Sequence, residues 1–112
     1  MELDEAGPLG PDQLKYLADE HKERYRRLES LFAADGWPLL VALCKKQAVE
    51  AHNRAANSQT WEQNRMNVGL RTAYEHIAVI EKATYAEFTE IAETARQAEL
   101  EAELEDELKH QS

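Results

Sequence analysis

The feature that most constrains this chain is a long C-terminal stretch without residues that break helices. No proline follows Pro38, and Gly69 is the only glycine in the second half of the chain. Thr60 and Gln63 fit a capping box, in which the threonine side chain caps an amide of the first turn and the glutamine reaches back to the threonine amide. One helix is therefore predicted from residue 61 to about residue 108, with a length of about 70 Å at 1.5 Å per residue.

An apolar stripe of helical period runs along this predicted helix. Its members are Met66, Leu70, Ala73, Ile77, Ile80, Thr84, Phe88, Ile91, Ala95 and Ala98. A stripe of this kind packs against other helices. Gly69 lies inside the helix, where it costs about 1 kcal/mol relative to alanine, so we expect a neighbouring helix to approach closely there.

Two shorter helices are predicted before the long one, over residues 11–34 and 38–57. Pro11 suits the first turn of a helix, Gly36 is expected to end the first helix in a left-handed conformation, and Pro38 opens the second. The apolar stripe of the first helix is Leu14, Leu17, His21, Tyr25, Leu28, Leu31 and Phe32, and that of the second is Leu40, Val41, Cys44, Ala48, Ala51 and Ala55.

These patterns predict an all-α fold, namely a three-helix antiparallel arrangement with a very long C-terminal helix that extends beyond the bundle. Helices of about 24 and 20 residues reach only about 36 and 30 Å, so they cannot cover the third helix. The predicted organisation is a flexible acidic arm at residues 1–10, a helical domain at residues 11–95 and an acidic C-terminal extension at residues 96–112.

Charge is sorted along the sequence into three blocks. Residues 1–20 have a net charge of -5, residues 21–82 of +3 and residues 83–112 of -7, which together give the total of -9. Segregated charge bears on partners and solubility rather than on fold. The C-terminal block is the largest imbalance.

The middle block contains a basic cluster, and nucleic-acid binding is the function that such a cluster would serve. Its bases are Lys22, Arg24, Arg26 and Arg27. Acids are interleaved with them, and Glu23 is placed to pair with Arg27 four residues away on one helix face. Phosphate binding needs an unbalanced basic surface, so direct nucleic-acid binding is not expected.

The motifs of catalysis and of cofactor binding are missing. The sequence has no phosphate-binding loop, dinucleotide fingerprint, zinc-ligand cluster or nucleophile motif. Di-iron sites in helical bundles need two Glu-x-x-His elements, and only Glu107 with His110 fits. Cys44 is the single cysteine and lies in an apolar run, as expected of a buried, reduced thiol in a cytoplasmic protein. The longest apolar run, residues 37–44, is far shorter than the roughly 20 residues that span a bilayer. We therefore expect no enzyme, no cofactor, no metal site and no membrane span.

The predicted contact residues for a protein partner, or for a second copy of the chain, fall into two groups. The first group is Trp37, Trp61, Phe88 and Ile91. Tryptophan is enriched at interface hot spots, although each tryptophan also suits a corner between helices. Phe88 and Ile91 belong to the part of the stripe that the shorter helices cannot cover.

The second group lies in the C-terminal extension. It consists of the apolar residues Leu100, Leu104 and Leu108 and the acidic contact residues Glu99, Glu101, Glu103, Glu105 and Glu107. Like charges four residues apart, and acids at the negative end of the helix dipole, destabilise an isolated helix. We expect this segment to fray alone and to become ordered on a basic partner surface. A solvated tail that aids solubility is the alternative.

Part of the sequence is familiar. Trp37 lies early in a predicted helix, Thr60-Trp61-Glu62 opens another, Gly69 follows Trp61 by eight residues, and Leu70 begins the apolar pattern. Over residues 37–82 this resembles small helical proteins encoded among the head and packaging genes of tailed bacteriophages. Those proteins often have a proline shortly after the second stripe, and this chain has none, so its C-terminal half is outside the comparison.

The resemblance implies a non-enzymatic virion or assembly component, present in several copies, in the host cytoplasm or the virion. The function predicted from the sequence is a helical interaction protein that oligomerises or docks through its long C-terminal helix. The alternative is a small acidic inhibitor or adaptor, such as a phage anti-defence protein, that binds a basic, nucleic-acid-binding surface of a host protein.

Overall fold

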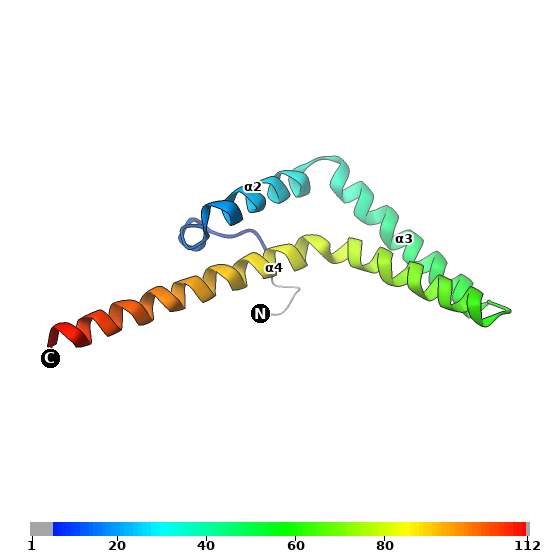
Figure 1. Ribbon diagram of the computed structural model, residues 1–112. Coiled ribbons are helices and arrows are strands. Elements are labelled where there is room, and N and C mark those ends of the chain that lie inside the picture. The colour runs from blue at the N-terminus through cyan, green and yellow to red at the C-terminus, as the bar shows by residue number, and fades with distance from the viewer. Residues whose placement is uncertain (1–5, 112) are drawn as a thin grey trace. The chain divides into compact units, whose positions relative to one another are not determined.

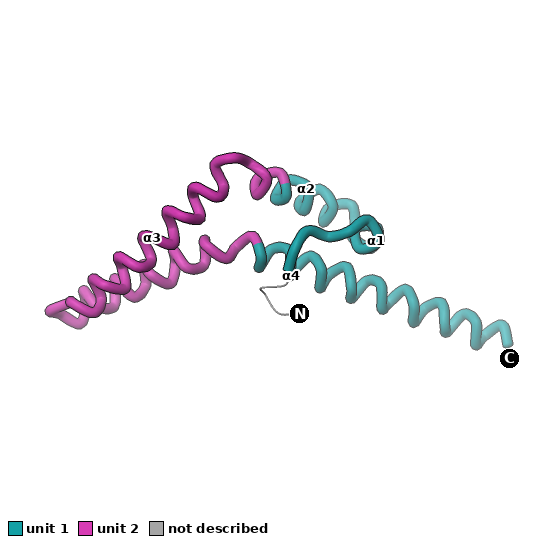
Figure 2. The backbone as a smooth tube through the Cα atoms, turned by 180° about the vertical axis from the view of Figure 1, so that it is seen from behind, with its two compact units in different colours: residues 1–29, 82–112 teal, residues 30–81 magenta. Residues whose placement is uncertain are grey.

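The computed structural model describes residues 6–111, which form four helices and no strand (Figure 1). The helices are α1 (Pro11–Leu14), α2 (Asp19–Ala33), α3 (Gly36–Ala56) and α4 (Trp61–Gln111). The predictions of an all-α fold and of a long C-terminal helix are confirmed. The chain divides into two compact units, coloured in Figure 2: unit 1 contains residues up to 29 and from 82 onward, and unit 2 contains residues 30–81.

The single helix predicted over residues 11–34 is divided into α1 and α2. After α1, the amides of Tyr16 and Leu17 donate to carbonyls only three residues back, at 3.1 Å each, so the helix tightens into a turn. The turn buries Leu17, which is 3% exposed. Helix propensity alone favours continuation through this segment, but burial of Leu17 outweighs it.

The acidic arm predicted at residues 1–10 lies partly outside the described residues. Within the described part, Leu9 is buried in unit 1 and its amide donates to the Tyr25 hydroxyl at 2.9 Å. Gly10 precedes α1, and its amide donates to the Gln13 side chain at 2.9 Å. Residues 9 and 10 are therefore fixed to unit 1 rather than free.

The core of unit 1 is aromatic and joins α2 to α4. Tyr25 contacts Phe88 edge to face, with ring centroids 5.4 Å apart, and Tyr85 lies 6.0 Å from Tyr25. The Tyr25 hydroxyl donates to Glu29 at 2.9 Å. Burial, helped by the nearby Glu29 carboxylate, raises the pKa of Tyr25 to about 12, although the Leu9 hydrogen bond acts in the opposite direction.

Unit 2 contains an antiparallel helix pair, formed by α3 and the first part of α4. The α3 residues that face α4 are Trp37, Val41, Cys44, Ala48, Ala51 and Ala55, and the α4 residues that face α3 are Asn67, Arg71, Tyr74, Ala78 and Glu81. We call these two sets the seam. Spacings of four and three alternate along both sets, which is the heptad pattern of a coiled coil.

The seam of α4 differs from the predicted apolar stripe. Asn67, and not Met66, is buried, while Met66, Leu70, Ile77 and Ile80 are all exposed. Each seam residue follows a stripe residue by one position, so α4 is rotated by about 100° from the predicted orientation. The stripe of α3, in contrast, lies in the seam as predicted, except for Leu40.

The caps and glycines follow local chemistry. The Gln63 amide donates to the Thr60 hydroxyl at 3.1 Å, as the capping box predicts, but the Gln63 side chain accepts from the Gln59 amide at 3.4 Å rather than from Thr60. Gly36 was expected to be left-handed, yet no described residue has positive φ, and Gly36 opens α3. Here Phe32 and Trp37 pack across the corner, with ring centroids 4.9 Å apart.

Gly69 has no neighbour within 4 Å of the position that a Cβ would occupy. The predicted close approach of a helix is therefore wrong in this structure. The Gly69→Ala variant should be more stable than the wild type by about 0.5–1 kcal/mol, because alanine loses less backbone entropy in a helix. Urea denaturation followed by circular dichroism measures this difference. Destabilisation instead would reveal a surface that packs against residue 69.

Candidate protein-interaction surface

Exposed apolar side chains concentrate in unit 2. Of the fifteen large apolar residues that are exposed within residues 6–111, twelve lie in unit 2, and the other three are Leu100, Leu104 and Leu108. Scattered exposed apolar residues are normal on a monomer, but a contiguous group marks a site of interaction. The arrangement of this group therefore defines the candidate site.

Six of the twelve lie directly before a seam residue. They are Leu40, Leu43, Met66, Leu70, Ile77 and Ile80, and we call them the apolar face. Moving back one residue rotates a side chain by about 100° in the same sense on each helix. In an antiparallel pair, such positions of both helices lie on the same side, so the apolar face is one surface built from α3 and α4.

The opposite side of the helix pair confirms this geometry. An open groove of about 430 Å³ lies there, lined by Lys45, Ala48, Val49 and His52 of α3 and by Arg71, Glu75 and Ala78 of α4. On α3, Ala48 belongs to the seam, and Lys45, Val49 and His52 each directly follow a seam residue. On α4, Arg71 and Ala78 belong to the seam, and Glu75 directly follows Tyr74. Since the positions that follow the seam share one side, those that precede it share the other.

A polar network holds α4 in this rotation. Arg54 donates through Nε to the Asn67 side-chain oxygen at 3.2 Å, and the Asn67 amide group donates to the Gln63 carbonyl at 3.0 Å. Asn64 donates to the carbonyl of Ala55 at 3.0 Å, which closes the turn. These bonds satisfy Asn67, which is buried, and the bond from Arg54 of α3 requires that Asn67 face α3.

A further contact extends the network away from the turn. Arg71 lies 2.8 Å from Nδ1 of His52 and 3.8 Å from the Glu75 carboxylate. Because arginine only donates, His52 Nδ1 accepts this bond. Alanines at positions 48, 51 and 55 of α3 leave room for the long Arg71 and Tyr74 side chains in the seam. The small residues of α3 and the polar residues of α4 are therefore complementary.

Two of the predicted contact residues are buried within the chain itself. Phe88 is 1% exposed in the core of unit 1, where His21 and Tyr25 contact its ring edge to face and Arg24 lies 5.9 Å above it. Trp37 is buried at the corner before α3. Neither side chain is available to a partner in this conformation, so both are core residues.

The other two predicted residues of that group remain accessible. Trp61 is 69% exposed, and the Arg65 guanidinium lies 5.0 Å from its ring centre, as in a cation–π contact. Ile91 is half-buried. Trp61 is therefore an exposed aromatic residue beside the turn of unit 2 and not a buried corner anchor.

The C-terminal extension is helical to Gln111. Leu100, Leu104 and Leu108 are exposed, and so are Glu99, Glu101, Glu103, Glu105 and Glu107. Towards its start, Arg96 donates to Glu93 through Nε at 3.0 Å, and this hydrogen bond lowers the pKa of Glu93 to about 2. The extension thus presents acids and leucines together, while Arg96 at its start lines an open pocket with Asp12, Gln13 and Tyr16.

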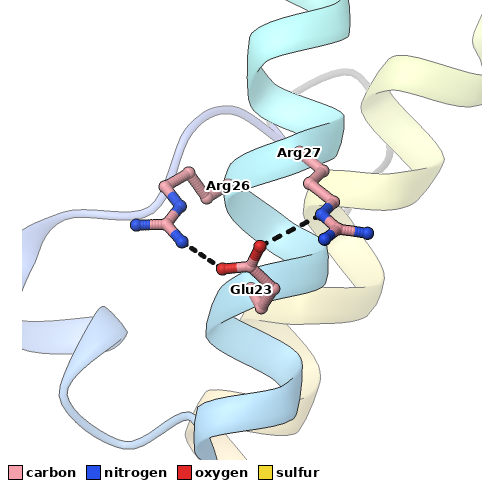
Figure 3. Close-up of polar contacts among 3 residues, drawn as sticks. All are labelled: Glu23, Arg26 and Arg27. Carbon is pink, nitrogen blue, oxygen red and sulfur yellow. Dashed lines mark hydrogen bonds and ion pairs between the residues drawn. The ribbon is translucent and has the colours of Figure 1, made fainter.

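The four bases of α2 are matched in number by four acids, Asp19, Glu20, Glu23 and Glu29. Glu23 accepts from both Arg26 and Arg27, the latter at 3.0 Å (Figure 3). The hydrogen bond and charge of Arg26, followed by those of Arg27, lower the pKa of Glu23. The predicted Glu23–Arg27 pair is confirmed. Because α2 contains as many acids as bases, the helix as a whole has no net charge.

Neither a metal site nor a membrane span is found within residues 6–111. No group of three or more histidine, cysteine, aspartate or glutamate residues there is arranged to hold a metal ion. No helix in that part of the chain has the length and apolar content that crossing a membrane requires.

Comparison of the whole chain with protein-family models, with curated proteins and with solved structures finds no match.

The assignment of Phe88 to the core gives a direct prediction. The Phe88→Ala variant should lose about 3–5 kcal/mol of unfolding free energy, as expected for a buried aromatic residue. The Leu104→Ala variant should lose less than about 0.5 kcal/mol, because Leu104 is 59% exposed. Chemical denaturation measures both. If both variants lost equally little unfolding free energy, Phe88 would be a contact residue rather than a core residue.

Proposed function

We propose that this protein is a non-enzymatic helical interaction protein that binds a protein partner through the apolar face of unit 2. The single observation that supports the proposal is the apolar face itself, six exposed side chains on one side of an antiparallel helix pair. Interface centres are depleted in charge and rich in apolar side chains, and the half of this surface around Leu40, Leu43, Ile77 and Ile80 has that composition. Nearer the turn, Gln47, Glu50 and Arg54 occupy the corresponding positions of α3 and give that half a polar margin.

The assembly role of the protein is part of the same proposal. The proposed role is that of a virion or assembly component of a tailed phage, in the host cytoplasm or the virion. This role is supported by the resemblance of residues 37–82, which contain most of unit 2. The antiparallel three-helix arrangement predicted from the sequence also belongs to this proposal. The sequence pointed to the C-terminal helix as the docking element, and the proposal now includes α3 beside it.

A second candidate function follows from the C-terminal extension. Its five exposed glutamates and three exposed leucines suit a basic surface with apolar pockets, as in an acidic inhibitor or adaptor of a nucleic-acid-binding protein. Such binding depends on charge, so it weakens steeply as salt rises. Binding through the apolar face does not.

Site-specific photocrosslinking in the cells that produce the protein tests the proposal. A photoreactive amino acid at position 43 should give a covalent adduct with a protein, because Leu43 belongs to the apolar face. The matched control is position 49, where Val49 is similarly exposed on α3 but lines the opposite groove. Mass spectrometry identifies the adducts.

Adducts at position 43 and none at position 49 would support the apolar face as the binding surface. An adduct from position 104 alone would favour the inhibitor. The proposal is overturned if neither position 43 nor position 77 gives an adduct.

A further inference from the structure

The charge of this chain divides unevenly between its two units. Unit 2 contains five bases and five acids and has no net charge, so the rest of the chain carries the entire -9. A surface that selected an acidic or a basic partner would show an excess of one sign. Unit 2 shows none, so its net charge does not oppose the approach of the same unit of a second copy.

We propose that the partner of the apolar face is a second copy of the same chain. This inference rests on the proposed function and names its partner. In the pair, the apolar faces of two unit 2 helix pairs meet across a two-fold axis, and the four helices form a four-helix bundle.

The register of the helix pair concentrates the apolar face at one level. Arg54 contacts Asn67, and His52 contacts Arg71. In an antiparallel pair, the numbers of two residues that lie opposite each other add up to a nearly constant value along the helices. Continuing this count places Leu40 and Leu43 of α3 level with Ile77 and Ile80 of α4. These four side chains form the end of the apolar face that is farther from the turn.

The size of the apolar face suits a modest dimer. Its side chains are between 37% and 61% exposed, which corresponds to a patch of about 300–600 Å² on each copy. Two such patches with their polar margins bury about 1,000 Å², the lower limit for a specific interface. We therefore expect a dissociation constant in the micromolar range, roughly 1–100 μM.

Unit 2 also needs a second apolar surface for its own stability. Its seam is made largely of alanines on α3 and of polar side chains on α4, so the pair buries few large apolar residues. Isolated helix pairs of about 50 residues are marginal when their core is this small. Pairing of two copies would cover the leucine and isoleucine surface that remains exposed in the described part of the chain.

The two-fold geometry explains why association would stop at two copies, because an isologous pair uses both apolar faces. Each chain brings -9 outside unit 2. Repulsion between these acidic parts opposes every association, including the dimer, and no apolar face remains free to offset it for a third copy. Higher salt screens this repulsion, so the dimer should persist or tighten as salt rises.

Sedimentation velocity of the purified full chain tests the inference. Over about a hundredfold range of concentration, the wild type should shift from the mass of one chain to that of two. The Ile77→Glu variant should weaken the dimer at least about 10-fold, because it buries a charge among the apolar side chains of Leu40, Leu43 and Ile80. The Val79→Glu variant is the matched control, since Val79 lies two residues away, is 42% exposed and does not belong to the apolar face.

A second pair of variants guards against misfolding. Leu43→Glu should behave like Ile77→Glu, and Val49→Glu should behave like the wild type, with circular dichroism showing equal helix content in all four. The proposal that the partner is a second copy is overturned if the wild type stays monomeric at every concentration or if raising salt dissociates the dimer. It is also overturned if Ile77→Glu and Val79→Glu change the dissociation constant equally. A photocrosslinked adduct between position 43 and a different protein would also overturn it, while leaving the proposed function standing.

Discussion

The hydrogen bond from Arg54 to the buried Asn67 is the contact on which the surface of unit 2 depends. A buried amide must be satisfied, and here its partners are a side chain of α3 and a carbonyl of its own helix. Fixing Asn67 in the seam fixes the rotation of α4. That rotation turns Ile77 and Ile80 outward, so a polar contact inside the helix pair creates the apolar face outside it.

The two units contribute different properties to one chain. Unit 1 buries an aromatic core around Phe88 and carries the net charge, including the acidic extension. Unit 2 buries mainly small residues, is neutral and exposes most of the large apolar side chains. A protein that assembles through one part and stays soluble through the other would have this division.

The helical class, the long α4 and the Thr60 cap could be predicted from sequence, because they depend on local propensity and capping. The break after α1 could not, since burial of Leu17 decides it. The rotation of α4 was also missed: counting apolar residues selects Met66 and Ile77, whereas the seam contains Asn67 and Ala78. The available signal for this rotation was the row of alanines in α3, Ala48, Ala51 and Ala55, at spacings of three and four residues. Small residues on one helix accommodate large or polar residues on the facing helix.

In unit 2, α4 turns Ala78, and not Ile77, towards α3. The single native cysteine, Cys44, lies in the seam of α3 level with both positions, so mild oxidation of the Ala78→Cys and Ile77→Cys variants tests it. A disulfide requires Cα atoms within about 7 Å. The expected result is an intramolecular bond in Ala78→Cys alone, seen by mass spectrometry of the full chain. An intramolecular bond to Cys44 in Ile77→Cys and none in Ala78→Cys would contradict this orientation of α4.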